Sequence, residues 1–221
     1  DWIALSFVRT VDELRTLRAL IRDAGRDVPI IAKLEKREAM EDLDGIIAEA
    51  DGIMVARGDL GLEIGLEQVP FAQKRIIAMT DRAGKPEITA TQMLESMMHH
   101  PRPTRAEVAD VANAVLDGSD AVMLSGETAV GRYPVEACRT MAGIAAVAEQ
   151  HIVYAGRLRS ETTGRDGDIG AAVARAACRT ASEIGARVIV CCTRSGRTAR
   201  LIAGHRPETP LAVVSPSEDT L

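Results

Sequence analysis

Apolar residues fall into short, uniform runs that alternate with longer amphipathic segments over the first two thirds of the chain. Runs that are apolar throughout and bounded by polar residues are typical of buried strands in a parallel sheet. These runs occupy residues 2–7, 30–34, 52–56, 88–90 and 121–124. The pattern therefore predicts five strands separated by helical connections.

Helical periodicity marks several of the connecting segments. After the first run, apolar residues spaced for one helix face follow a threonine–glutamate capping box: Thr10, Val11, Glu13, Leu14, Leu17 and Ile21. Before the last run, Thr104 and Glu107 predict the start of a helix, and Gly118 predicts its end. Further helices are predicted over residues 71–83 and 134–150.

Repeated strand–helix units with short links predict a parallel sheet. Their spacing suits either a (β/α)₈ barrel or an open doubly wound sheet. Five strands are too few to close a barrel. The chain also begins without methionine, at residues that already look like a strand. We therefore expect a fragment of a longer protein.

The pattern changes near residue 151. Residues 151–167 are polar and irregular, with a loop predicted over 161–167. A second α/β unit follows, with helices predicted over 169–184 and 198–204 and strands over 187–192 and 211–214. A domain boundary placed here gives a first domain of residues 1–150 and a second of residues 151–221.

Composition narrows the range of partners. The formal net charge is −5, aromatic residues make up 2% of the chain, and Lys and Arg are scattered, which argues against nucleic acid and anionic membrane surfaces. No apolar stretch reaches the length of a membrane span. The four cysteines form no CxxC pair, so we expect buried, inert thiols and a cytoplasmic location, with metal or disulfide use as the alternative.

Polar residues able to bind a metal or an anion follow each of the five predicted strands. In parallel α/β folds, reactive groups collect at the carboxyl ends of strands. Lys33 and Glu35 are two residues apart on one strand, so their side chains point to the same side, and Asp59 follows the next strand. Two carboxylates without nearby Cys or His suit a hard cation such as Mg²⁺ or Mn²⁺. A simple Lys33–Glu35 ion pair is the alternative.

Two further segments are candidate anion sites. Gly58 and Gly61 flank Asp59, where free backbone N–H groups could bind an anion or the chain could simply form a tight turn. In the second unit, hydroxyl groups, two arginines and a helix start predict a phosphate site made of Thr193, Arg194, Ser195, Gly196, Arg197 and Thr198. A polar turn with a helix cap is the alternative there.

Several long stretches resemble the pyruvate kinase family. They are DWIALSFVR (1–9), IIAKLEKRE (30–38), DGIMVARGDLGLEI (51–64), ITATQMLESM (88–97), PRPTRAEVADVANAVLDGSDAVMLSGETAVGRYP (101–134) and TRSGRTAR (193–200). The resemblance implies an α/β fold: an incomplete (β/α)₈ TIM-type barrel, about strands four to eight, followed by part of a carboxy-terminal α/β regulatory domain. It also implies the glycolytic transfer of a phosphoryl group from phosphoenolpyruvate to ADP, giving pyruvate and ATP.

The same resemblance assigns roles in the first domain. Glu35 and Asp59 correspond to ligands of Mg²⁺ or Mn²⁺, whereas the ligands of K⁺ would lie outside this chain. Lys33 corresponds to the cation that stabilises the phosphoryl group and the enolate, and Thr91 to a threonine that helps to arrange enolate protonation. The implied catalytic residues are Lys33, Thr91 and Arg57, and the implied substrate-binding residues are Lys33, Ala56, Arg57, Gly58, Asp59 and Thr91.

For the second domain, the resemblance implies that residues 193–198 bind the phosphate of a phosphorylated allosteric effector. It also implies a homotetramer for the complete protein. Because the first three strands of the family's barrel are missing, we expect the isolated chain to be inactive.

The sequence departs from the family's usual pattern at three positions. Glu87 stands where an apolar residue is usual, and an unpaired carboxylate there would be costly. Gly65 replaces a usual proline, and Lys36 replaces a usual asparagine. These changes bear on local stability and leave the implied reaction untouched.

Two other functions compete with a phosphotransferase. A metal-dependent lyase of a related barrel would also place a Glu and an Asp on neighbouring strands, but such enzymes lack the PRPTRAEV and MLSGETA stretches. A non-catalytic effector-binding module would need residues 193–198 only. The combination of Lys33, Glu35, Asp59 and Thr91 argues against that module.

Overall fold

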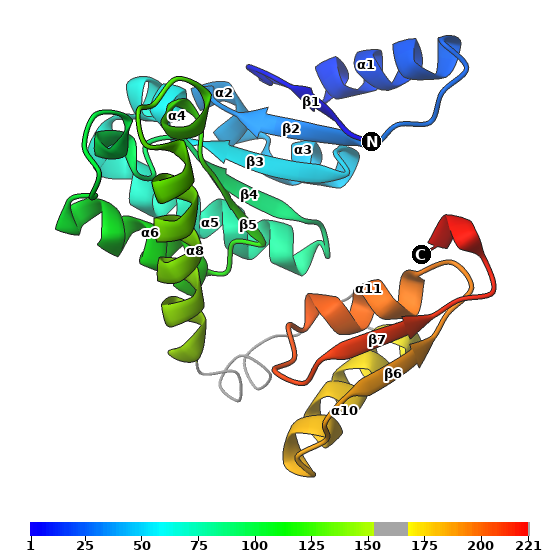
Figure 1. The fold of residues 1–221 in the computed structure, drawn as a ribbon. Helices are drawn as coiled ribbons and strands as arrows, with labels where there is room; N and C mark the ends of the chain where they lie inside the picture. Colours follow the sequence, from blue (N-terminus) through cyan, green and yellow to red (C-terminus); the bar gives the residue numbers. More distant parts are fainter. Residues whose placement is uncertain (153–167, 221) are drawn as a thin grey trace. The chain divides into compact units, whose positions relative to one another are not determined.

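The computed structural model describes residues 1–152 and 168–220, which belong to two compact units (Figure 1). The larger unit consists of Asp1–Asp81 and Lys85–Ile152, and the smaller unit contains residues 168–220. The loop predicted over 161–167 lies outside the described residues.

Five parallel strands form the sheet of the larger unit, in the order in which they occur along the chain. They are β1 (Ile3–Leu5), β2 (Ile30–Leu34), β3 (Gly52–Ala56), β4 (Glu87–Ala90) and β5 (Ala121–Met123). Each pairs in parallel with the next, so all five carboxyl ends lie at one edge of the sheet (Figure 1). The predicted strands and the predicted parallel α/β fold are therefore confirmed.

The longer helices begin and end close to the predicted residues. They are α1 (Val11–Asp23), α5 (Val69–Arg82), α6 (Arg105–Asp117) and α8 (Pro134–Gln150). The capping box of α6 is present: the Thr104 hydroxyl accepts a hydrogen bond from the Glu107 N–H, and the Glu107 carboxylate accepts one from the Thr104 N–H. Gly118 ends α6 with a φ of 112°, which glycine adopts without steric cost.

The core of the larger unit lies between the sheet and its helices. Alternate residues of the central strands are fully buried, for example Ile30, Ala32 and Leu34 of β2. They pack with residues of α1 and of α3 (Leu43–Glu49) such as Leu14 and Ile46. Burial of this apolar surface fixes the sheet, and with it the positions of the polar residues that follow each strand.

Four short helices were not predicted. They are α2 (Arg37–Glu41), α3, α4 (Arg57–Ile64) and α7 (Gly126–Ala129). Three 3₁₀ turns, η1 (Leu66–Gln68), η2 (Glu95–Met98) and η3 (Glu218–Thr220), complete the described elements. The tight turn considered for the glycines around Asp59 is absent, because Gly58 and Gly61 lie within helix α4.

The smaller unit is built from α10 (Ile169–Glu183), β6 (Ile189–Cys192), α11 (Arg197–Gly204) and β7 (Leu211–Val214). β6 and β7 pair in parallel, and α10 and α11 pack with β6 around a small apolar cluster. The Asp168 carboxylate caps α10 by accepting from the N–H of Gly170 at 2.9 Å.

The cysteines differ in part from the expectation of buried thiols. Cys178 and Cys191 are buried, whereas Cys138 and Cys192 are exposed, and all four are free. The exposed pair was mispredicted because Cys138 lies on a helix with one solvent face, and alternate residues of β6 face solvent.

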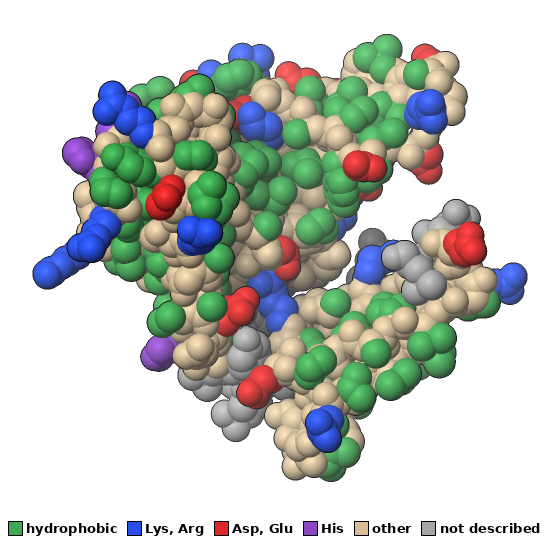
Figure 2. All heavy atoms as spheres, in the orientation of Figure 1, with side chains coloured by type: hydrophobic (Ala, Val, Ile, Leu, Met, Phe, Trp, Pro, Cys, Tyr) green, Lys and Arg blue, Asp and Glu red, His purple; other side chains and the backbone are tan. Residues whose placement is uncertain are grey.

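Charged side chains of both signs are interspersed with hydrophobic ones on the face that Figure 2 shows. Several large apolar side chains are exposed at the edge strand β1 and its exit, namely Trp2, Ile3 and Phe7. No helix in the described part of the chain has both the length and the apolar character needed to span a membrane.

Candidate functional site

The polar residues that follow β2, β3 and β4 meet at one edge of the sheet. Lys33 of β2 is in register with Met54 of β3, and Ala56 of β3 is in register with Ala90 of β4. The carboxyl ends of these three strands are therefore neighbours (Figure 1). This is the edge at which parallel α/β folds place their reactive groups.

Lys33 and Glu35 form an ion pair at the end of β2. The Lys33 Nζ lies 2.8 Å from Glu35 Oε1 and donates a hydrogen bond to the Ser6 hydroxyl at 3.0 Å. The other Glu35 oxygen accepts the backbone N–H of Phe7 at 2.6 Å. The Glu35 side chain is 3% exposed, whereas that of Lys33 is 24% exposed. The carboxylate is thus fixed by β1 and β2, while the ammonium group reaches solvent.

Asp59 lies in the first turn of α4 and is exposed. Ala56, the last residue of β3, is buried directly before the helix starts. A negative charge in the first turn is favourable because the helix dipole is positive there. Among the described residues, no three His, Cys, Asp or Glu side chains form a metal-binding group. Glu35 and Asp59 supply oxygen donors of the type that Mg²⁺ prefers, and a small ligand set of this kind leaves positions for water or substrate.

Thr91 follows β4 in an unusual backbone conformation. Its φ is 67°, and that of Gln92 is 53°, so two consecutive non-glycine residues are left-handed. The Thr91 hydroxyl accepts the N–H of Gly58 at 2.8 Å, which joins the exit of β4 to the start of α4. A β-branched residue in this region is a genuine outlier, and such strain is common at functional sites.

Arg57 is buried, with its side chain 5% exposed, and its guanidinium group points at the protein's own backbone and side chains. It donates to the carbonyl oxygens of Thr91 and Gln92 and pairs with Asp110 of α6. It also contacts the side chains of Gln73 and Met93. The sequence did not identify Asp110 or Gln73 as neighbours of this arginine. Only their position one helix layer away brings them to Arg57, and no local pattern shows this.

Glu127 follows β5, the last of the five polar strand exits, and it is also buried. Its two carboxylate oxygens accept the backbone N–H groups of Leu94 at 3.0 Å and Ser125 at 2.8 Å. Both acceptors are therefore used to hold loops together at the edge of the sheet.

The predicted phosphate loop of the smaller unit joins β6 to α11. Thr193 is buried, and its N–H donates to the Val214 carbonyl at 3.0 Å. Gly196 has a φ of 73° and precedes the first residue of α11, Arg197. Arg197 pairs with Asp168 at 2.6 Å, while the side chains of Arg194 and Ser195 are exposed. Four of the six predicted residues, Arg194, Ser195, Arg197 and Thr198, are exposed beside the helix start, whereas Thr193 and Gly196 are buried. Phosphate binding by this loop stays a prediction.

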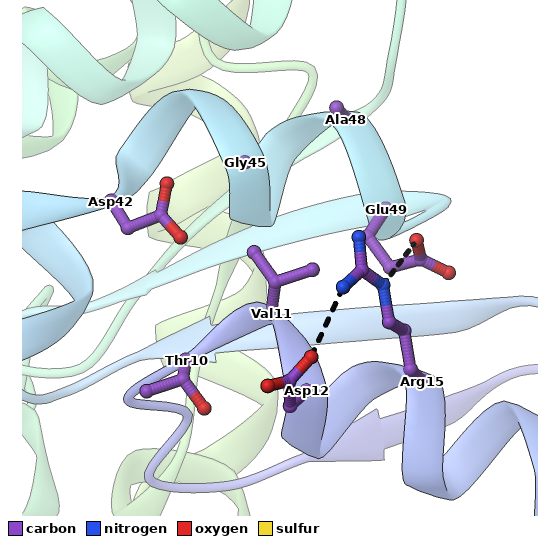
Figure 3. Close-up of a pocket in the computed structure, with 8 residues that line it drawn as sticks. All are labelled: Thr10, Val11, Asp12, Arg15, Asp42, Gly45, Ala48 and Glu49. Atoms are coloured by element: carbon purple, nitrogen blue, oxygen red, sulfur yellow. Dashed lines mark hydrogen bonds and ion pairs between the residues drawn. The ribbon is translucent and has the colours of Figure 1, made fainter.

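A cavity of about 450 Å³ lies between the start of α1 and α3 (Figure 3). Its lining residues are Thr10, Val11, Asp12, Arg15, Asp42, Gly45, Ala48 and Glu49. Arg15 of α1 pairs with Asp12 of the same helix at 3.0 Å and with Glu49 of α3, on the other side of this cavity, at 3.5 Å. None of the predicted site residues lines it, so the strand-end cluster and this cavity are separate features.

Comparison with known proteins identifies relatives for both units. Residues 1–138 match the family model "Pyruvate kinase, barrel domain", and residues 171–221 match "Pyruvate kinase, alpha/beta domain". Pyruvate kinase 2 of Synechocystis sp. is 49% identical over 219 residues, which are 99% of this chain and 36% of that protein. Pyruvate kinase of Eimeria tenella is 52% identical over 223 residues, which are 100% of this chain and 42% of that protein.

A solved structure agrees with these sequence matches. The crystal structure of a pyruvate kinase from Cryptosporidium parvum superposes with a TM-score of 0.94 at 42% identity, and the match covers 100% of this chain and 47% of that one. The chain thus spans less than half the length of each of these three relatives.

Proposed function

The chain belongs to the pyruvate kinase family, and on that premise we propose that the whole protein transfers the phosphoryl group of phosphoenolpyruvate to ADP, giving pyruvate and ATP. The observation that carries the proposal is the Lys33–Glu35 pair, which lies at the carboxyl end of β2 beside the ends of β3 and β4. Phosphoryl transfer depends mainly on positioning and charge neutralisation, and this cluster offers both.

Lys33 is the cation for the phosphoryl group in transfer and for the enolate that remains. Its side chain is partly exposed, so the ammonium group can reach a ligand, while Glu35 and Ser6 hold it at the strand end. A preorganised charge of this kind stabilises the charge that develops in the transition state.

Glu35 and Asp59 would hold Mg²⁺ or Mn²⁺, consistent with their hard oxygen donors. Such an ion, when bound, neutralises negative charge on the phosphoryl oxygens. The Phe7 N–H keeps Glu35 oriented, and the ion pair with Lys33 offsets part of the cost of burying this carboxylate. We place the ligands of K⁺ outside this chain.

The start of α4 is the proposed seat of the substrate carboxylate. Backbone N–H groups at Ala56, Arg57 and Gly58 precede or open this helix, and helix N-termini favour anions. The Gly58 N–H already donates to the Thr91 hydroxyl, so a bound carboxylate would share or replace that bond. The Thr91 hydroxyl contacts the Gly58 N–H and so lies at the same place, where it can act in protonation of the enolate.

The loop of residues 193–198 is the proposed phosphate site for an allosteric effector. Two arginines support this proposal. Arg194 is exposed, and Arg197 pairs with Asp168, which a bound phosphate group would have to replace. We also propose a homotetramer and a cytoplasmic location for the whole protein; both rest on family membership alone.

Two lysine substitutions, Lys33→Met and Lys36→Met, test the proposed reaction. In the complete enzyme, we expect ADP-dependent formation of pyruvate from phosphoenolpyruvate, and Lys33→Met should lower turnover on the order of a thousandfold because one preorganised charge is lost. Lys36→Met is the matched control, because Lys36 lies three residues away and pairs with Glu63 at 2.6 Å. It should stay within about threefold of the wild type, since Lys36 pairs with Glu63 of α4 and not with Glu35, and a partly exposed ion pair contributes little.

The measurement is pyruvate formation in a coupled assay, with Mn²⁺ binding followed in parallel. Lys33→Met should still bind the metal, because the carboxylates remain. A complete wild-type enzyme that makes no pyruvate refutes the reaction, and near-normal turnover of Lys33→Met removes Lys33 from it.

A further inference from the structure

The exit of β4 carries backbone strain that its own sequence does not relieve. Thr91 and Gln92 have φ values of 67° and 53°, and neither is glycine. Left-handed residues of this kind persist only where the surrounding structure holds them. The contacts that hold Thr91 and Gln92 in this conformation therefore help to determine the position of the Thr91 hydroxyl.

The guanidinium group of Arg57 donates hydrogen bonds to the carbonyl groups of both strained residues. The Thr91 carbonyl accepts from Nε at 3.2 Å and from Nη2 at 2.8 Å, and Nη2 also donates to the Gln92 carbonyl at 3.1 Å. The planar fork of an arginine can hold two neighbouring carbonyl groups in one orientation, which a lysine cannot do.

The third side-chain nitrogen of Arg57, Nη1, contacts residues of helices α5 and α6. Nη1 lies 2.7 Å from Asp110 of α6 and donates to Gln73 of α5 at 3.3 Å. Every nitrogen of this buried cation therefore has a partner inside the protein. The pairing satisfies a charge that would otherwise be costly to bury.

The far side of the strained segment faces the candidate site. The Thr91 hydroxyl accepts the Gly58 N–H at 2.8 Å and donates to the Ala90 carbonyl at 2.6 Å. Thr91 is thus held from two sides: Arg57 binds its carbonyl oxygen, and its hydroxyl bonds to the Gly58 N–H at the start of α4. Its φ of 67° joins these two orientations in one residue.

We propose that Arg57 is a positioning residue, whose guanidinium group holds Thr91 and Gln92 in the left-handed conformation and so aims the Thr91 hydroxyl at the start of α4. The inference rests on the proposed function, and it gives the Arg57 side chain a task distinct from contact with substrate.

Arg57→Lys in the complete enzyme tests this role. The charge and much of the packing remain, but the planar fork is lost. The kcat should therefore fall on the order of 10- to 100-fold, because a misplaced catalytic group such as the Thr91 hydroxyl lowers the rate by about this factor. The KM for phosphoenolpyruvate should change by less than about threefold, because uniform binding is not altered.

Glycine at position 92 provides the decisive rescue. Because glycine adopts positive φ without steric cost, Gln92→Gly should recover at least about tenfold of the lost kcat in the Arg57→Lys background. The exposed Gln92 side chain loses little packing in this change. Arg206→Gly is the matched control: Arg206 is also a non-glycine residue with positive φ, at 45°, but it lies in the smaller unit and should give no rescue.

The outcomes separate the two proposals. A wild-type enzyme without pyruvate formation refutes the proposed function. An active wild type with an unchanged kcat in Arg57→Lys, or a loss that Gln92→Gly does not recover, overturns the positioning role. If Arg57→Lys does not fold in a thermal melt, Asp110→Asn replaces it. That variant keeps the arginine but weakens its anchor, and recovery by Gln92→Gly decides the question in the same way.

Discussion

Two arginines occupy the same place in the two units. Arg57 is the first residue of α4, directly after β3, and Arg197 is the first residue of α11, in the connection that follows β6. Their side chains differ in exposure: 5% for Arg57 and 61% for Arg197. A strand followed by an arginine at a helix start therefore produces two different structures.

The difference shows what burial does to an arginine. The side-chain nitrogens of Arg57 all donate to carbonyl oxygens and side chains of its own unit, so a ligand would have to displace one of these bonds to reach the guanidinium group. Arg197 pairs with the partly exposed Asp168, and its own side chain is accessible to an incoming phosphate. The buried arginine shapes a site, whereas the exposed one can bind a ligand directly.

Truncating each arginine should give the largest contrast in stability. Arg57→Ala leaves the Thr91 and Gln92 carbonyls without their donor and opens space among buried side chains, so the free energy of unfolding should fall by about 3 to 4 kcal/mol. Arg197→Ala should cost less than about 1 kcal/mol, because solvent screens an exposed pair. Urea unfolding of the chain, followed by circular dichroism, measures both. Equal losses would contradict the assignment of one structural and one accessible arginine.

Glu87 sharpens the contrast, because it is a buried charged group without a full set of partners. It lies on β4, whose exit Arg57 holds, and is 0% exposed. Its Oε1 accepts from the Thr89 hydroxyl at 3.0 Å, but Oε2 has no hydrogen-bond partner among the described residues. Burial raises the pKa of Glu87 to about 7, with Asp120 and Asp81 adding to the rise and hydrogen bonds from Ser119 and Thr89 opposing it.

This raised pKa makes stability depend on pH. The folded chain holds the Glu87 proton more tightly than the unfolded chain, whose carboxyl has the ordinary pKa of about 4.3. The contribution of Glu87 is thus fully present below about pH 4 and is lost as the pH rises to about 7. Glu87→Gln should match the wild type near pH 4 and exceed its free energy of unfolding by about 3 kcal/mol at pH 8.

Unfolding curves at pH 4, 6 and 8 measure this effect. Glu67→Gln, at an exposed position, is the control and should show no such divergence. A Glu87→Gln variant that is less stable than the wild type at pH 8 would show that the ionised carboxylate is favourable where it is.

The smallest expected effects concern the glycines that flank the two helices. Gly65 ends α4 with φ 92° and ψ 138°, and Gly196 precedes α11 with φ 73° and ψ −9°. The first conformation is nearly restricted to glycine, whereas the second is left-handed helical and tolerates other residues at moderate cost. Gly65→Ala should therefore lower the free energy of unfolding by about 2 kcal/mol and Gly196→Ala by about 1 kcal/mol. Calorimetric melts rank them, and the reverse order would contradict this account.

The strands and the long helices could be predicted because each has a strong local signal. Parallel strands buried on both faces are apolar throughout. The capping box of Thr104 and Glu107 marks the start of α6, and Gly118 marks its end. Helix α4 had no such signal: its sequence, with two glycines and three charged residues, has no clear apolar face. Its helical state is set by β3 before it and by the contacts of Arg57, which a local pattern does not contain.

The site was predictable to the same extent. The positions of Lys33, Glu35 and Asp59 after successive strands placed them at one edge of the sheet, and the structure brings Lys33 and Glu35 within 2.8 Å. The sequence could not show the direction of the Arg57 side chain, because its partner Asp110 is 53 residues away. Departures from the family at Glu87 and Gly65 were visible in sequence, but only the structure shows the orphaned oxygen and the positive φ.

The most direct measurement is kcat at saturating phosphoenolpyruvate and ADP for the complete enzyme with Arg57→Lys and with Arg197→Lys, compared side by side without effector. We expect kcat to fall on the order of 10- to 100-fold in Arg57→Lys, since this substitution displaces Thr91, and to change by less than about twofold in Arg197→Lys. Equal effects of the two substitutions, or a larger loss for Arg197→Lys, would contradict this expectation.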